Sequence, residues 1–120
     1  MSRVTHFELD ADNPQRAITF YESVFGWEIT QWADQPYWLV KTGEANEPGI
    51  DGAIRPRTPG GSTTNTVVVP SVDEFLAKVV KAGGTVVQPK MPVPMMGFLA
   101  YCRDTEGNVF GIIQMDPNAS

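Results

Sequence analysis

The sequence predicts an α+β protein in which two βαβββ modules form a mixed sheet with a concave cleft. Its 120 residues make about one domain, and 42 % of them are hydrophobic and 19 % charged, as is usual for a globular domain. The same order of elements, a strand, a helix, a glycine stop and three strands, occurs twice. A sheet with one helix on one face leaves its other face uncovered. Two such faces side by side make a cleft suited to a small molecule, and the alternative is that the open face pairs with another protein.

The first predicted strand is Val4–Leu9, where the side chains on one face of the strand are more polar than those on the other. Phe7 and Leu9 share the face that is expected to pack against the helix. His6 and Glu8 therefore lie on the opposite face, toward the cleft.

The rest of the first module, which spans about residues 3–56, consists of a helix and three short strands. Asp12-Asn-Pro14 predicts the helix start, because Asp and Asn cap free backbone amides and proline suits the first helical position. Gly26 predicts its end. The three strands are expected at Trp27–Trp32, Tyr37–Lys41 and about 49–54.

The second module, about residues 63–116, repeats this order after a linker rich in proline and glycine, Arg55–Ser62. Ser71 and Glu74 have the spacing of a capping box at a helix start, and Gly83-Gly84 marks the end of the helix. Its strands are expected at Thr64–Val69, Thr85–Gln88, Phe98–Arg103 and Asn108–Met115.

Charge and cysteine content exclude several classes of protein. Fourteen acidic residues against nine basic ones give a net charge of −5, which repels phosphate backbones and anionic lipids, so neither nucleic acid nor a membrane is expected as a partner. No signal-peptide pattern and no spanning apolar run is visible in the sequence. Cys102 is the single cysteine and forms no internal disulfide. These features predict a cytoplasmic protein.

Several motifs resemble those of one superfamily, in order and at the right separations. They are His6–Leu9, Asp12–Tyr21, Val24–Trp27, Asp104–Asn108 and Val109–Gln114. Together they resemble the glyoxalase, bleomycin-resistance and extradiol-dioxygenase superfamily, the vicinal oxygen chelate proteins, and most of all its small single-domain members related to lactoylglutathione lyase. The resemblance implies a single glyoxalase-like domain over residues 1–120, a small-molecule ligand and a symmetric homodimer.

The enzymes of that superfamily hold a divalent metal with four side chains, and the resemblance allows each position to be checked. His6 matches the first ligand position and the second aligns near Asp51, whereas Thr64 and Gly111 stand at the third and fourth. Glu8 shares the face of His6 and is a weaker candidate ligand, displaced by about 6.5 Å along the strand. The resemblance therefore implies a degenerate metal site with no bound cofactor, and a divalent metal remains the alternative.

Eight residues are predicted to contact the ligand. Tyr101 aligns with an aromatic pocket position of the superfamily and shares a strand face with Leu99, while Gly111 leaves room for a ligand. Trp38, or Tyr37 in the opposite register, adds an aromatic wall; core packing is the alternative for these aromatic side chains. The family resemblance places the methionine- and proline-rich loop 88–97 at the cleft mouth, as a lid, and the alternative is an edge that meets another subunit. The full set is His6, Glu8, Trp38, Thr64, Met96, Leu99, Tyr101 and Gly111.

Three functions remain open at this point. The first is a glyoxalase-like protein with a degenerate metal site, which binds a small molecule without chemistry or transfers a proton through His6 as its catalytic residue. The second is a metal-dependent lyase, isomerase or dioxygenase that uses His6 and non-standard ligands. The third is an interaction module whose cleft is filled by its own side chains.

Overall fold

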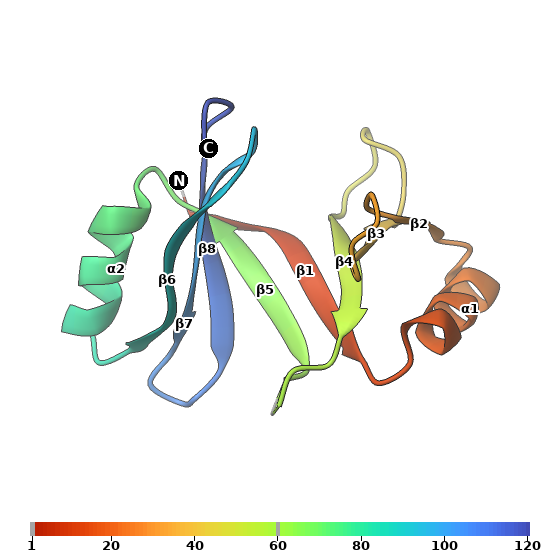
Figure 1. Ribbon diagram of the computed structural model, residues 1–120, viewed down its shortest axis with the longest axis horizontal. Coiled ribbons are helices and arrows are strands. Elements are labelled where there is room, and N and C mark those ends of the chain that lie inside the picture. Colours follow the sequence, from red (N-terminus) through yellow and green to blue (C-terminus); the bar gives the residue numbers. More distant parts are fainter. Residues whose placement is uncertain (1, 60) are drawn as a thin grey trace. The chain divides into compact units, whose positions relative to one another are not determined.

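The computed structural model describes residues 2–59 and 61–120 as an α+β structure of strands and two helices. The chain divides into two compact units. One is His6–Thr64, and the other is Asn65–Ser120 together with the N-terminal residues up to Thr5. Figure 1 shows one helix beside the strands of each unit. No helix among the described residues is long and apolar enough to cross a membrane.

The first βαβββ module has its strands in the order β2-β3-β4-β1. Strands β1 and β4 pair in parallel, and the other neighbours pair antiparallel. The parallel register sets His6 beside Asp51 and Asp10 beside Arg55. The elements are β1 (Arg3–Ala11), α1 (Pro14–Phe25), β2 (Glu28–Gln31), β3 (Trp38–Lys41) and β4 (Asp51–Pro56).

Local signals place helix α1 as predicted. The side chain of Asn13 accepts a hydrogen bond from the backbone N–H of Arg16, and Pro14 occupies the first turn. Gly26 ends the helix in the left-handed conformation, at a φ of 71°. The start at Asp12-Asn-Pro14 and the stop at Gly26 are therefore confirmed.

The core of this module decides which face of β1 is open. Ala11, Ile18, Val40 and Ile54 are its buried residues, and the partly buried side chains packed against them include Phe7, Leu9, Tyr21, Trp27 and Trp38. The rings of Tyr21 and Trp27 stack in parallel, 5.0 Å apart. Because Phe7 and Leu9 pack in this core, the alternation of β1 turns His6, Glu8 and Asp10 to the opposite face.

The second module has the strand order β5-β8-β7-β6. Ser71 caps its helix by accepting a hydrogen bond from the backbone N–H of Glu74, as predicted. Its core consists of Val69, Val72, Ala100 and Ile112. Cys102 is also buried, and burial raises the pKa of its thiol. The elements are β5 (Thr63–Val68), α2 (Val72–Lys81), β6 (Thr85–Val93), β7 (Gly97–Arg103) and β8 (Val109–Met115).

Two sequence-based expectations are wrong. The sequence predicts a loop for the proline-rich segment 88–97, yet β6 continues through Pro89 and Pro92 to Val93, with register shifts against β7. A strand at the end of the sheet order tolerates proline because one side of its backbone has no strand to pair with. The sequence also predicts a linker from Arg55, yet β4 includes this residue, because its backbone pairs with Asp10 in the parallel ladder between β1 and β4.

Candidate functional site

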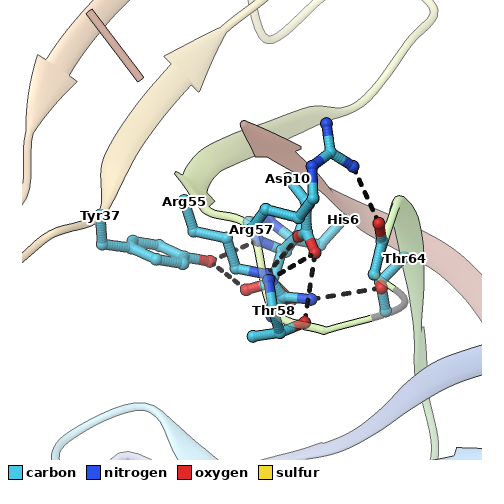
Figure 2. A network of polar contacts seen from close by, with 9 residues as sticks. His6, Asp10, Tyr37, Arg55, Arg57, Thr58 and Thr64 are labelled. Carbon is cyan, nitrogen blue, oxygen red and sulfur yellow. Dashed lines mark hydrogen bonds and ion pairs between the residues drawn. The ribbon is translucent and has the colours of Figure 1, made fainter. Parts of the chain in front are cut away.

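A polar network covers the open face of the first module (Figure 2). Strand β1 contributes His6, Glu8 and Asp10, β4 contributes Arg55, and Tyr37 precedes β3. The parallel pairing of β1 with β4 sets Asp10 and Arg55 side by side. All of these residues belong to the compact unit His6–Thr64, so the geometry of the network is a property of one unit.

The network contains a chain of hydrogen bonds with a defined direction. The hydroxyl of Tyr37 donates to Glu8 Oε2 at 2.7 Å, and His6 Nε2 lies 3.0 Å from the same hydroxyl oxygen. A phenol has one hydrogen. Since this hydrogen goes to the carboxylate, the Tyr37 oxygen is the acceptor for His6, and Nε2 carries the proton.

The environment of His6 favours its neutral form. Burial of the ring lowers its pKa below the usual 6.5, and the positive charge of Arg55 also lowers it. Glu8 and Asp51 act in the opposite direction, but their combined effect does not restore the usual value. A neutral imidazole with a proton on Nε2 presents a lone pair on Nδ1.

That second nitrogen is accessible. Among residues 2–59 and 61–120, His6 Nδ1 makes no hydrogen bond, and no fully buried side-chain nitrogen or oxygen lacks a partner. Nδ1 therefore lies at the accessible surface of the network. It can accept a hydrogen bond or a proton from a bound molecule.

Arg55 holds the network together by donating from all three of its nitrogens. Nε bonds Asp10 and one terminal nitrogen bonds Glu8, both at 2.7 Å, while the other terminal nitrogen bonds the Thr64 hydroxyl at 3.3 Å. The side chains of Asp10 and Glu8 are 0 % and 5 % exposed, against 19 % for Arg55. Thr58 also donates to Asp10 from its backbone N–H and its hydroxyl. The two buried carboxylates are thus paired and hydrogen-bonded, as buried charges must be.

The donor set does not fit a tightly held metal ion. Within the part of the chain that the structure describes, no group of three or more His, Cys, Asp and Glu side chains is placed to bind one. Glu8 is engaged by Arg55 and Tyr37, and Asp51 accepts hydrogen bonds from the backbone N–H and hydroxyl of Thr42. Thr64 and Gly111 supply no carboxylate or imidazole. A catalytic metal site normally has three protein ligands.

The predicted ligand contacts divide between the two units. His6 and Glu8 lie in the network, and Thr64 is buried beside it, bonded to Arg55. In the other unit, Tyr101 pairs with Gly111 across β7 and β8. A side chain at Gly111 would meet Tyr101 and the Thr66 hydroxyl, so glycine allows these two side chains to lie close to the backbone of β8. Leu99 shares the face of Tyr101, and Met96 is exposed in the turn before β7.

Sequence reasoning missed Asp10, Arg55 and Thr58 of the network and named Tyr37 only as the alternative to Trp38. Trp38 packs in the core and Tyr37 joins the network, which is the opposite register that the sequence leaves as an alternative. Arg55 falls in the predicted linker. The signal that points to it is the pair of acids on the open face of β1, because two carboxylates need a cationic partner when that face is buried, as it is for Asp10 and Glu8.

A hollow of about 540 Å³ lies beside helix α1 and shares Asp10 with the network, but His6, Glu8 and Tyr37 are not among its lining residues. It is lined by Leu9, Asp10, Ala11, Asp12, Asn13, Arg16, Ala17, Phe20, Tyr21, Arg57, Ser62 and Thr63. Its lining comes from β1, α1 and the chain around Arg57 and Ser62, whereas the accessible imidazole nitrogen belongs to His6, which is not among the lining residues. The hydrogen-bonded network, rather than this hollow, is therefore the candidate functional site.

Comparison with solved structures shows the same fold in other proteins. A glyoxalase/bleomycin resistance protein/dioxygenase superfamily member from Vibrio splendidus has a TM-score of 0.70 at 14 % identity, covering 97 % of this chain and 100 % of that one. A variant of the methylmalonyl-CoA epimerase of Streptomyces coelicolor, in complex with 2-nitronate-propionyl-CoA, has a TM-score of 0.68 at 15 % identity, covering 98 % of this chain and 97 % of that one. These likenesses show the vicinal oxygen chelate fold.

Sequence comparison shows the family. Proteins of Mycobacterium bovis and Mycobacterium tuberculosis named "Putative glyoxylase CFP32" are 31 % identical over 115 residues, which is 92 % of this chain. The chain spans 43 % of the length of these relatives. The family model described as "Glyoxalase-like domain" matches residues 6–113. The chain therefore belongs to the glyoxalase-like domain family.

Proposed function

We propose that this chain is a small-molecule-binding protein of the glyoxalase-like family, whose ligand contacts the open face of the first module without a metal held by its side chains. The observation that carries the proposal is the hydrogen-bonded chain from Glu8 through Tyr37 to His6. It fixes the orientation of one imidazole and leaves His6 Nδ1 accessible. A preorganised acceptor of this kind is typical of a ligand site, which has a few well-placed polar groups.

The same atom supports proton transfer as the chemistry of the site. A neutral imidazole is a base at physiological pH, and Glu8 stabilises the charge that it gains through the intervening hydroxyl of Tyr37. Burial keeps the resting pKa low, so the base is unprotonated before a ligand arrives. In this proposal His6 Nδ1 receives the proton, and the rest of the network holds the ring in place.

A ligand screen tests the proposal. Trp32 lies 6.1 Å from the ring of Tyr37, measured between ring centroids, so its fluorescence reports on the site. We expect at least one compound of a small-molecule library to shift the tryptophan emission. His6→Ala is expected to weaken that binding about threefold to tenfold, the effect of one lost hydrogen bond, with the fold intact. Binding is also expected to weaken as the pH falls through the lowered pKa of His6, because protonation removes the acceptor.

The matched control is Gln15→Ala on the surface of α1, which is expected to leave affinity and emission unchanged. Equal affinity of the wild type and His6→Ala for the ligand would show that the imidazole of His6 does not contact the ligand. Failure of every compound to shift the emission would favour the third function, an interaction module with a filled face.

Metal content separates the proposal from a metal-dependent lyase, isomerase or dioxygenase. We expect the purified chain to retain far less than one equivalent of Mn, Fe, Ni or Zn after incubation and dialysis, measured by elemental analysis, and His6→Ala to give the same result. The reason is that Glu8 and Asp51 are already engaged within the chain. Near-stoichiometric metal that is lost in His6→Ala would overturn the proposal in favour of the metal-dependent enzyme.

Homodimer formation and a cytoplasmic location stay predictions. Both come from the sequence, the first from the family resemblance and the second from the charge and the single cysteine. The molar mass of the chain in solution checks the first of them.

A further inference from the structure

The direction of the hydrogen bonds at His6 restricts what a ligand can present to it. Tyr37 donates its single hydrogen to Glu8, so Nε2 of His6 donates to Tyr37 and Nδ1 holds a lone pair. A carbonyl, carboxylate or phosphate oxygen is itself a hydrogen-bond acceptor. Placed against Nδ1 it would face the lone pair of the nitrogen with its own lone pair, and no hydrogen bond would form. A hydroxyl or amine N–H would instead donate a hydrogen bond to it.

The charges of the same face also oppose an anionic ligand. Glu8, Asp10 and Asp51 lie on this face of β1 and β4, where Arg55 is the cation beside them. Each nitrogen of Arg55 already donates within the chain.

The next cation along the sheet, Lys41 of β3, is also engaged. Its ammonium is paired with Glu44 at 3.0 Å and with Glu28 at 3.8 Å. An anion bound beside His6 would therefore be desolvated next to carboxylates, while both of these cations already serve partners within the chain. The net charge of −5 over the whole chain adds to this repulsion.

We propose that the ligand of this site is a neutral or cationic small molecule that donates an O–H or N–H hydrogen bond to His6 Nδ1, and that carboxylates and phosphates are excluded. This inference rests on the proposed function and deepens it by naming the ligand class. Tyr37 is the positioning residue: it sets the tautomer of His6 by accepting from Nε2. The aromatic rings of Tyr37 and Trp32, in edge-on contact, favour a ligand that also carries a flat apolar group.

The first arm of the test measures the tautomer without any ligand. The chain has one histidine, so imidazole nitrogen NMR of uniformly labelled protein reports on His6 alone. At neutral pH we expect a protonated Nε2 and an unprotonated Nδ1. Tyr37→Phe removes the acceptor for Nε2–H and is expected to give a mixture of the two tautomers. A wild-type spectrum with the proton on Nδ1 would overturn the inference, whatever the ligand.

The second arm uses three probes with the same ring: benzyl alcohol, benzylamine and benzoate. We expect the alcohol and the amine to shift the Nδ1 resonance toward the value of a hydrogen-bonded nitrogen, and benzoate to bind at least tenfold more weakly. In Tyr37→Phe the ratio of the affinities for the alcohol and for benzoate is expected to fall severalfold, because the imidazole of His6 can then present an N–H to the ligand. Loss of affinity for all three probes alike in this variant would indicate a merely structural role for Tyr37 and would count against the inference.

Failure of the inference is distinguishable from failure of the proposed function. If benzoate binds as tightly as benzyl alcohol and shifts the imidazole nitrogen resonances of His6, the ligand need not be a hydrogen-bond donor. That result would overturn the inference while leaving a small-molecule site in place. If none of the three probes shifts either imidazole nitrogen, both the inference and the proposed function are contradicted.

Discussion

Arg55→Ala is expected to lower the free energy of unfolding by about 3–5 kcal/mol, the range for breaking a buried ion pair by removing one partner. The guanidinium satisfies two carboxylates whose side chains are 0 % and 5 % exposed, Asp10 and Glu8. Without it, both charges stay buried with no guanidinium to pair with, and the Thr64 hydroxyl loses a donor. Urea denaturation followed by tryptophan fluorescence measures the loss.

Two further variants test whether the loss of stability in Arg55→Ala comes from the buried ion pairs of this arginine. Arg57→Ala, on the same stretch of chain, breaks an ion pair with Asp12 whose side chains are 42 % and 70 % exposed, and is expected to cost about 0–1 kcal/mol. Arg55→Lys keeps the charge but not the planar group that reaches three partners, so it is expected to fall between wild type and Arg55→Ala. A loss no larger for Arg55→Ala than for Arg57→Ala would contradict the central role of Arg55.

Ile54→Ala is expected to destabilise the chain by about 2–5 kcal/mol, through lost apolar burial and the cavity left behind. Ile54 is 0 % exposed and belongs to the core beneath the network, with Ala11, Ile18 and Val40. It adjoins Arg55 on β4 and projects to the opposite face, so it helps to hold the strand that carries the guanidinium. Denaturant unfolding and the thermal midpoint both measure the effect.

The control for this prediction is Ile50→Ala, which makes the same chemical change at a residue that is 36 % exposed. It is expected to alter stability by about 0.5 kcal/mol or less. Equal losses for the two isoleucines would show that Ile54 is not a buried core residue.

Much of the fold follows from local signals that need no tertiary information. The alternation of residues 4–9 separates the core face of β1 from its open face, and Asn13, Pro14 and Gly26 delimit α1. These features depend on backbone geometry and on the period of apolar residues, which a single sequence contains. The orientation of His6 toward the open face could be predicted for the same reason.

Other features depend on which strands become neighbours. Whether Pro89 and Pro92 interrupt a strand depends on its place in the sheet, since a strand at the end of the order can accept them. The role of Arg55 depends on the register that sets it beside Asp10. Neither the order of strands nor their register is determined by local periodicity.

The βαβββ order of each module, the family resemblance and the face of β1 on which His6 and Glu8 lie could all be read from the amino-acid sequence. Tertiary contacts were needed to establish that Tyr37 rather than Trp38 reaches that face, and that Arg55 pairs with the acids of β1. The tautomer of His6 also required them, because it depends on a single hydroxyl hydrogen of Tyr37, 31 residues away along the chain. Periodicity places a side chain on a face, whereas the direction of a hydrogen bond depends on partners that folding brings together.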